Sequence, residues 1–253
     1  MNQAARADAV QLYAAGSLRA ALTDVSKAFR AVSGVAVQGK YGPSGILEDE
    51  IARGAKADVF ASANMTHPQT LAETGKSGPV VLFARNRLCA LVRPGLGVTT
   101  ANLLDRMLEP EVKLGTSTPK ADPSGDYAFE VFGKAEGLRR GARAALQDKA
   151  LQLTGGPSSE QPPAGRNAYA WHVAEGRADI FLAYCSAAGE AQKQNPNQQI
   201  VELPRELAVG ADYGLTVMVG AAAGAEQFAR FVLSPTGQGI LINHGFKPGQ
   251  TER

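Results

Sequence analysis

The sequence lacks long hydrophobic runs, blocks of one charge and metal-binding motifs. No apolar stretch approaches the roughly 18 residues that a membrane-spanning helix needs. Lysine and arginine together number 26 against 24 aspartate and glutamate residues, and no basic segment interleaved with aromatic residues occurs, which argues against a nucleic-acid-binding protein. The three histidines, His67, His172 and His244, do not form the i, i+4 pair of a zinc helix, so we expect packed or surface histidines rather than metal ligands.

Motifs for common catalytic and nucleotide sites are missing as well. Neither a phosphate-binding GxxxxGK[ST] loop nor a dinucleotide-binding GxGxxG turn occurs in the chain. A G-x-S-x-G nucleophile elbow would need a second glycine where Ile46 stands in GPSGI. The sequence therefore indicates a protein that is not an enzyme and that needs no cofactor.

Cysteine is scarce. Cys89 and Cys185 each lie in an apolar stretch, RLCALV and FLAYCSA, and they do not form a CxxC pair. Two cysteines alone cannot supply a four-ligand zinc site. Free cysteine is among the most buried residue types, so two buried thiols are predicted. A disulfide is the alternative, because the Cα separation cannot be judged from sequence.

A recognisable signal peptide is also missing from the N-terminus, MNQAARADAVQLYAAGS. The small residues of ARADA alternate as they do at a cleavage site, but no apolar core precedes them. An exported protein without its signal peptide is the expectation at this end of the chain.

Strands and helices alternate along the first 62 residues. VQLYA alternates as a strand does. A helix with one apolar face follows from residue 18 to 32, with Ser17 expected as its cap and Gly34 just past its end. A second helix is expected to begin at Ser44 as its cap and to end at Gly54. This alternation predicts a parallel sheet with right-handed crossovers.

A second α/β unit begins near NRLCALV, and the chain ends in two amphipathic helices, 225–233 and 236–244. The expected elements of this second unit are, in chain order, helix 99–108, strand 112–118, helix 124–137, strand 151–156, helix 166–176, strand 178–184 and strand 198–204. Two lobes follow, lobe I from residues 1–84 plus 205–253 and lobe II from residues 85–204. Each lobe is expected to be a mostly parallel sheet flanked by helices.

Serine- and glycine-rich junctions follow several of the expected strands. Ser17 and Ser44 stand at two of them in the first unit, and Ser124 and Arg166 stand at two in the second. The carboxyl ends of parallel strands are where open α/β sheets bind ligands, and the free N–H groups of a helix start favour an anion. A single serine at a helix start is most often only a cap. Four such junctions without a cluster of lysines and arginines favour a small tetrahedral oxyanion.

Several of these segments together resemble one known family, the periplasmic molybdate-binding proteins of ABC transporters. The resemblance covers residues 12 to 246 and is carried by AAGSLRAAL, GPSGILEDEIARGAKADVFASAN, NRLCALV, DPSGDYA, GRADIFLAY and SPTGQGILINHGF. It implies the type II periplasmic binding protein fold, an α/β fold of two lobes joined by a hinge that close over molybdate or tungstate. It further implies a periplasmic monomer that delivers its ligand to a membrane permease, and metal present only as part of the oxyanion.

The resemblance also implies a set of ligand-binding residues. Ser17 and Ser44 would each bind through hydroxyl and backbone N–H, and Tyr184 through its hydroxyl. Ser124, where the family usually has alanine, and Arg166, where it commonly has an apolar residue, would each bind through the backbone N–H. The neighbouring residues that could modify the site are Gly16, Gly45, Asp126 and Asn167.

Two departures from the family keep other ligands and activities open. A carboxylate at Asp126 would repel a dianion unless it points away, and the guanidinium of Arg166 could bind an oxyanion bidentately. The ligand could therefore be sulfate, phosphate or an organic carboxylate or phosphonate instead. An enzyme that uses Arg166 as a clamp and Asp126 as a base is a further alternative, and so is a ligand-sensing regulatory domain.

Overall fold

The computed structural model describes residues 9–249, which fall into two compact units. Unit 1 takes its residues from 1–85 and 212–253, and unit 2 takes residues 86–211. The N-terminal stub with ARADA lies outside the described residues, apart from Ala9. The chain passes from one unit to the other twice, within strand β4 (Val81–Val92) and strand β9 (Gly210–Val217). The sequence placed these two crossings near residues 85 and 205.

Unit 1 is built on a sheet whose first three strands run parallel. Strand β1 lies between β2 and β3, and β9 pairs antiparallel with the outer side of β3. A short strand at the C-terminal end of the chain pairs antiparallel with β4. The bounds are Val10–Ala15 for β1, Val37–Gly42 for β2, Val59–Ser62 for β3 and Lys247–Pro248 for β10.

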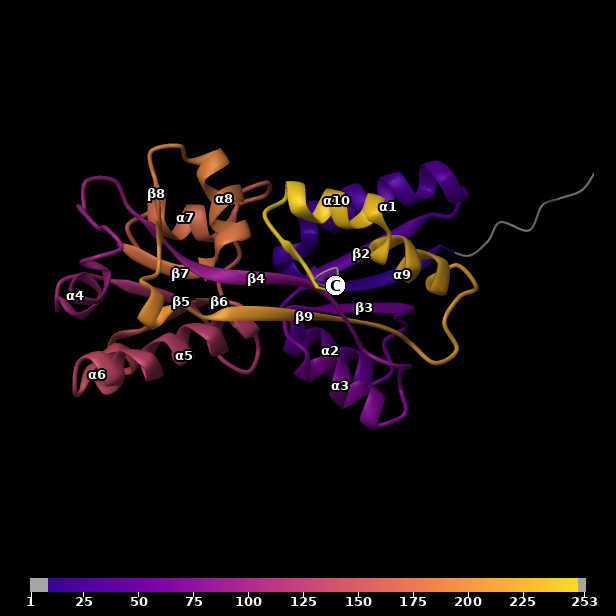
Figure 1. Cartoon of the computed structure of the whole chain (residues 1–253), viewed down its shortest axis with the longest axis horizontal. Coiled ribbons are helices and arrows are strands. Elements are labelled where there is room, and N and C mark those ends of the chain that lie inside the picture. Colours follow the sequence, from indigo (N-terminus) through magenta and orange to yellow (C-terminus); the bar gives the residue numbers. More distant parts are fainter. Residues whose placement is uncertain (1–8, 250–253) are drawn as a thin grey trace, which may run out of the picture. The chain divides into compact units, whose positions relative to one another are not determined.

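Helices cover both faces of this sheet (Figure 1). Helices α1 (Arg19–Ser33), α9 (Ala225–Leu233) and α10 (Pro235–Asn243) pack together on one face, and α2 (Ser44–Ala52) and α3 (Thr66–Glu73) pack together on the other. The two C-terminal helices match their predicted bounds within one residue. Apolar side chains at helical spacing, such as the buried Phe29 on α1, therefore face the sheet and the neighbouring helices.

The predicted helix ends of unit 1 are confirmed, but the predicted caps are wrong. Gly34 ends α1 with φ of 73°, a left-handed conformation that glycine adopts without steric cost. Ser17 instead lies inside a short 3-10 helix, η1 (Gly16–Leu18), and Ser44 is the first residue of α2. Neither hydroxyl caps its helix, because each is bonded to a residue distant in the sequence.

Unit 2 has a second sheet, in which β4 lies between β7 (Ile180–Tyr184) and β8 (Gln199–Glu202) and pairs antiparallel with both. Beyond β7, strands β5 (Leu114–Ser117) and β6 (Leu151–Thr154) run parallel to it in that order. The helices of this unit are α4 (Leu103–Leu108), α5 (Pro123–Leu138), α6 (Ala142–Lys149), α7 (Ala168–Ala174), α8 (Cys185–Gln194) and the short η2 (Arg205–Leu207). Helices α6 and α8 are absent from the sequence prediction.

Cys89 and Cys185 form a disulfide, so the prediction of two buried thiols is wrong. Strand β4 pairs with β7 so that Cys89 lies opposite Ala183, two residues before Cys185. The chain turns into α8 at Cys185, which brings the two Cα atoms to 4.9 Å. This distance lies within the range that a disulfide requires. The 96-residue separation hid this proximity from sequence reasoning.

Candidate functional site

The strongest candidate site in unit 1 is the edge where the parallel strands end. Ser17 follows β1, Ser44 follows β2, and Ala63 follows β3. The register places Ala15 opposite Gly42 and Ala14 opposite Ala61, so the three loops begin at the same edge. The sequence prediction that the Ser17 and Ser44 junctions share one edge is confirmed.

Ser44 is the most informative residue at this edge. Its side chain is buried, and its hydroxyl oxygen accepts the backbone N–H of Ala63 at 3.1 Å. A serine hydroxyl carries one proton besides its acceptor lone pairs, so accepting from Ala63 leaves that proton to donate. Gly45, also buried, follows it in the first turn of α2, which contains no acidic residue. This helix start therefore keeps its positive end uncompensated.

Ser17 lies beside Gly16 in η1 and is half-buried. Its hydroxyl is 3.0 Å from the phenol oxygen of Tyr213, a fully buried residue of β9. Sequence reasoning missed Tyr213, because ADYGLTV reads only as a strand and the pairing spans 196 residues. The phenol fixes where the Ser17 hydroxyl lies at this edge.

In unit 2, the start of helix α5 differs from the prediction. Asp122 caps this helix, and its carboxylate accepts the backbone N–H of Ser124 at 3.0 Å. The prediction of a free Ser124 N–H is therefore wrong. A signal was available, because proline is preferred at the first helical position, and Pro123 thus marks Asp122 as the cap. The Ser124 hydroxyl is buried and has no hydrogen-bond partner among the described residues.

The loop before α5 packs closely on the helix start. A Cβ atom on Gly125 would lie 2.6 Å from the carbonyl oxygen of Ser117, so only glycine fits there. Asp126 accepts the backbone N–H of Lys120 at 2.8 Å, and Lys120 itself has a left-handed φ of 68°. Such a conformation is costly for a residue other than glycine, so the Asp126 carboxylate stabilises the loop.

Arg166 and Asn167 also have other roles than the sequence suggested. The backbone N–H of Arg166 donates to the carbonyl of Pro163 at 3.0 Å, and its side chain is exposed. Helix α7 begins two residues later, and the Asn167 side chain caps it by accepting the N–H of Ala170 at 3.1 Å. The predicted backbone donor at Arg166 is therefore wrong, because a turn precedes the helix and uses that N–H.

Tyr184, the remaining predicted ligand, is the last residue of β7 and is almost fully buried. Its ring packs edge-on against that of Tyr127, with the centroids 6.2 Å apart. Leu88 lies opposite Tyr184 in the pairing of β4 with β7, and the disulfide at Cys185 follows directly. The position of this tyrosine is thus fixed from both sides of the strand end.

A further group of polar side chains in unit 2 was not predicted. We call it the hydroxyl cluster, and its members are Ser117, Ser124, Thr154 and Tyr169. The hydroxyls of Ser117 and Thr154 are 2.9 Å apart at the ends of β5 and β6, and both residues are buried. Burial of the phenol, and then the negative charge of Asp122, raise the pKa of Tyr169, while the nearby hydroxyls of Ser117 and Ser124 act in the opposite direction.

Comparison with known proteins identifies the family. Residues 10–247 match the family described as bacterial extracellular solute-binding protein. The chain belongs to this family. Its members are the solute-binding components of ABC transporters.

Individual relatives of this solute-binding protein differ in what is known of them. An uncharacterized protein of Pasteurella multocida is 35% identical, and the alignment covers 94% of this chain and 98% of the relative. The molybdate-binding protein ModA of Mycobacterium bovis is 26% identical over 95% of this chain and 85% of its own length. The solved structure of the sulfate-binding protein SubI from Mycobacterium tuberculosis matches with a TM-score of 0.77 at 20% identity, covering 95% of this chain and 86% of that one.

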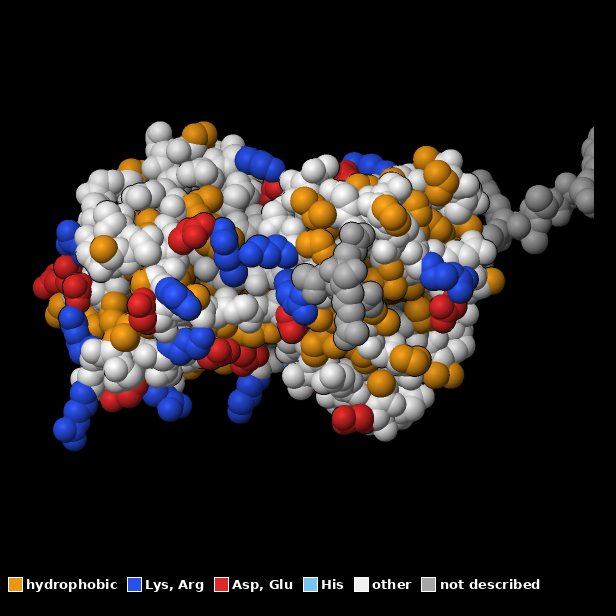
Figure 2. All heavy atoms as spheres, in the orientation of Figure 1, with side chains coloured by type: hydrophobic (Ala, Val, Ile, Leu, Met, Phe, Trp, Pro, Cys, Tyr) orange, Lys and Arg blue, Asp and Glu red, His pale blue; other side chains and the backbone are white. Residues whose placement is uncertain are grey.

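The structural match supports the predicted fold class. The solute-binding protein has the two-lobed α/β fold of periplasmic binding proteins, and its two units are the lobes. No helix within residues 9–249 is long and apolar enough to cross a bilayer. Nor does any group of three or more metal-ligating side chains occur in that same range. Figure 2 shows lysine and arginine side chains interspersed with acidic ones on the face in view.

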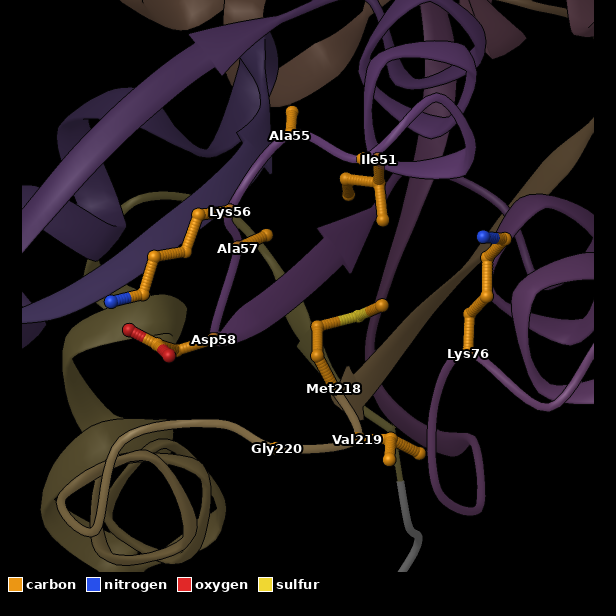
Figure 3. Close-up of a pocket in the computed structure, with 10 residues that line it drawn as sticks. Ile51, Ala55, Lys56, Ala57, Asp58, Lys76, Met218, Val219 and Gly220 are labelled. Carbon is orange, nitrogen blue, oxygen red and sulfur yellow. The ribbon is translucent and has the colours of Figure 1, made fainter.

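The solute-binding protein also has a shallow pocket of about 330 Å³ in unit 1. It lies at the amino end of β3, beside Asp58, whereas Ser44 contacts the residue after the carboxyl end of β3. Figure 3 shows Met218 near its centre, with Lys56 extending away from Met218. The buried Asp58 carboxylate accepts the backbone N–H groups of Gln11 and Ala222 at 2.7 and 2.8 Å. These bonds make Asp58 a structural residue that joins β1 to the loop after β9.

Proposed function

We propose that this solute-binding protein captures a small tetrahedral oxyanion, with molybdate or tungstate as the first candidates. The observation that carries the proposal is the buried Ser44 hydroxyl at the start of α2, which accepts the Ala63 N–H and keeps its proton for a ligand. The free N–H groups of the same helix start lie in a turn without acidic residues. Hydrogen bonds and the helix dipole then favour an anion at one place.

Ser17 adds a second hydroxyl at the same edge, positioned by Tyr213. From unit 2, Tyr184 would donate its hydroxyl to the bound anion. We infer that closure of the two lobes completes the donor set, and that a membrane permease recognises the closed protein. Likeness in sequence to a molybdate-binding protein over most of the chain supports this ligand class.

The disulfide supports a location outside the cytoplasm. Disulfides persist in oxidising compartments such as the bacterial periplasm and are rare in the cytosol. Cys89 and Cys185 are joined in this protein, so we place the mature protein in the periplasm, as a monomer that meets its permease there. No catalytic step is assigned to it, because Asp126, the base of the enzyme alternative, is bonded to the backbone of its own loop.

Sulfate and phosphate are the alternatives within the same ligand class. A fold shared with a sulfate-binding protein is compatible with either anion. Hydroxyl and N–H donors form hydrogen bonds with the lone pairs of the anion's oxygens. Molybdate, sulfate and phosphate share the tetrahedral arrangement of four oxygens, so donors placed for one of them also fit the others. Competition between these anions therefore separates the ligands where geometry does not.

Calorimetric titration of ligand-free protein with molybdate, repeated in excess sulfate, tests the proposal. We expect one site with a dissociation constant near micromolar or tighter, which corresponds to roughly −8 kcal/mol. Ser44→Ala removes a charge-assisted hydrogen bond, so it should weaken binding by about tenfold or more. Ser26→Ala is the matched control, since its hydroxyl bonds only within α1.

Two results would count against the proposal. Equal affinity in Ser44→Ala and Ser26→Ala would mean that the edge of unit 1 does not hold the anion. Loss of all molybdate heat in sulfate would keep the site but reassign its ligand.

A further inference from the structure

A positively charged side chain, that of Arg19, lies at the sheet edge of unit 1 that carries Ser17 and Ser44, which we call the Ser44 edge. Arg19 begins α1, directly after the η1 turn that holds Ser17. Its guanidinium donates to the carbonyl oxygen of Tyr41 at 3.3 Å, and its central carbon lies 4.9 Å from the centroid of the Tyr41 ring. Tyr41 pairs with Ala14 at the carboxyl end of β2. The cation therefore lies at the same end of the sheet as the two serines.

The charge of Arg19 is not neutralised by its neighbours. Within the described part of the chain, no carboxylate lies at ion-pair distance from the guanidinium. The ring beside it, that of Tyr41, belongs to an uncharged phenol, because burial raises the pKa of that hydroxyl. Glu48, one turn after Ser44 on α2, is bonded to His67 at 2.8 Å instead. The guanidinium thus adds a positive charge to this end of the sheet.

The side chain of Arg19 is held in place and is still exposed. A guanidinium has five N–H donors in a planar fork, and the bond to the Tyr41 carbonyl uses one of them. Stacking on the Tyr41 ring adds a cation–π contact. A charge fixed in this way acts on a charged ligand through its electric field, over a Debye length of about 8–10 Å at physiological ionic strength.

The other donors of the Ser44 edge carry no formal charge. Ser17 and Ser44 offer hydroxyls, and the start of α2 offers backbone N–H groups. Such donors fit the tetrahedral shape of an oxyanion whatever its charge. A full positive charge distinguishes ligands by charge, because its Coulomb energy with a dianion is twice that with a monoanion at the same position. A dianion also gives up more hydration on binding, so a site that holds one gains from a cation nearby.

We propose that Arg19 determines the charge specificity of the Ser44 edge, and that its guanidinium makes the site prefer a tetrahedral dianion to a monoanion of the same shape. This inference rests on the proposed function, since it takes the Ser44 edge as the place where the oxyanion binds. It adds a residue of unit 1 to the site and specifies the charge of the ligand. It applies to molybdate, tungstate and sulfate alike.

Two pairs of anions separate the effect of charge from that of shape. Molybdate and perrhenate are tetrahedral oxyanions of similar size with two charges and one, and sulfate and perchlorate form the corresponding smaller pair. Calorimetric titration of the full chain at low ionic strength measures the affinity for each anion. In the wild-type protein, the dianion should bind more tightly than its partner. Arg19→Gln should weaken dianion binding about fivefold and monoanion binding about twofold, so the ratio of affinities falls about two- to threefold.

Two further variants show whether the effect comes from the charge at this position. Arg30→Gln removes an exposed arginine from the last turn of the same helix, about 16 Å further along its axis, and should leave the ratio unchanged. Arg19→Lys keeps the charge without the planar fork, so it should retain most of the ratio. In about 1 M salt the Debye length falls to about 3 Å, and the wild-type protein and Arg19→Gln should then show the same ratio.

Several results would overturn the role of Arg19 and leave oxyanion capture intact. The ratio could stay unchanged in Arg19→Gln, or it could fall equally in Arg30→Gln. A loss of affinity that is equal for both charges and persists in high salt would mean that Arg19 only supports the η1 turn through Tyr41. A monoanion that binds neither the wild-type protein nor Arg19→Gln would assign the preference to other groups. If none of the four anions binds the wild-type protein, the proposed function fails as well.

Discussion

At the scale of single residues, the sequence placed the Ser17 and Ser44 junctions at one edge of the unit 1 sheet but did not predict the bonds made there. The sequence placed Ser44 correctly at a helix start but predicted it as the cap. A serine after a proline is compatible with the cap position and with the first helical position alike. Its real partner, the N–H of Ala63, comes from the end of another strand. Tyr213 could not be predicted for the same reason, since local pattern does not encode a contact with Ser17 across 196 residues.

The buried side chain of His172 should make the folded protein less stable in acid. The side chain is buried, stacks near Trp171 and Phe181, and has neither ring nitrogen bonded within the described residues. Burial, and then the positive charge of Arg177, lower its pKa below the ordinary value of 6.5. Just below pH 6.5, the unfolded chain therefore binds a proton at His172 that the folded chain does not bind. The stability from neutral His172 is complete above pH 6.5 and is lost as the pH falls below it.

His172→Phe should keep the packing and remove this acid sensitivity. The melting temperature should fall between pH 8 and pH 5 in both proteins, and the fall should be a few degrees smaller in the variant than in the wild-type protein. The pH 8 values control for any change in packing. An identical fall in both proteins would mean that His172 is protonated in the folded state.

At the scale of elements, the hydrophobic period predicted most strands and helices, and the helices that it missed have physical reasons. Helix α8 begins directly at the end of β7, the side chain of its N-cap residue Tyr184 makes no capping hydrogen bond, and the helix contains Gly189, so no start signal marks it. Helix α6 is short and begins after Gly141, whose φ is 83°. Tertiary packing of Leu146, which is fully buried, stabilises it where local signals are weak.

The close packing at the start of α5 should make the stability of the protein depend on glycine at position 125. Gly125→Ala would bring a Cβ atom to 2.6 Å from the backbone of the preceding loop. We expect this variant to lose about 1–3 kcal/mol of unfolding free energy, as overpacking does. Gly133→Ala in the same helix is the control, because nothing lies within 4 Å of its added Cβ, and alanine there should stabilise by about 0.5–1 kcal/mol. Urea denaturation measures both, and an equal response would refute the close packing at Gly125.

At the scale of the whole molecule, the sequence predicted two α/β units with crossings near residues 85 and 205, because the order of strands and helices is local information. The structure divides the chain after residues 85 and 211. It did not predict the disulfide, since the pairing of β4 with β7 depends on the folded sheet of unit 2. Both cysteines belong to that unit. The cross-link therefore stabilises one unit directly and leaves the other without one.

This asymmetry leads to a prediction about how the units unfold. The single tryptophan of the chain, Trp171, lies on α7 in unit 2, so its fluorescence reports on the unit that holds the disulfide. Replacing both cysteines by serine frees a 96-residue loop, which should cost unit 2 about 2–5 kcal/mol. The urea midpoint from fluorescence should then drop well below the midpoint from far-UV circular dichroism, which reports on both units.

Coincident midpoints in the variant would mean that the two units unfold as one cooperative body, and an unchanged fluorescence midpoint would mean that the disulfide adds little to unit 2. The separated midpoints are what we expect, because unit 1 has a sheet and core of its own that the cysteines do not touch.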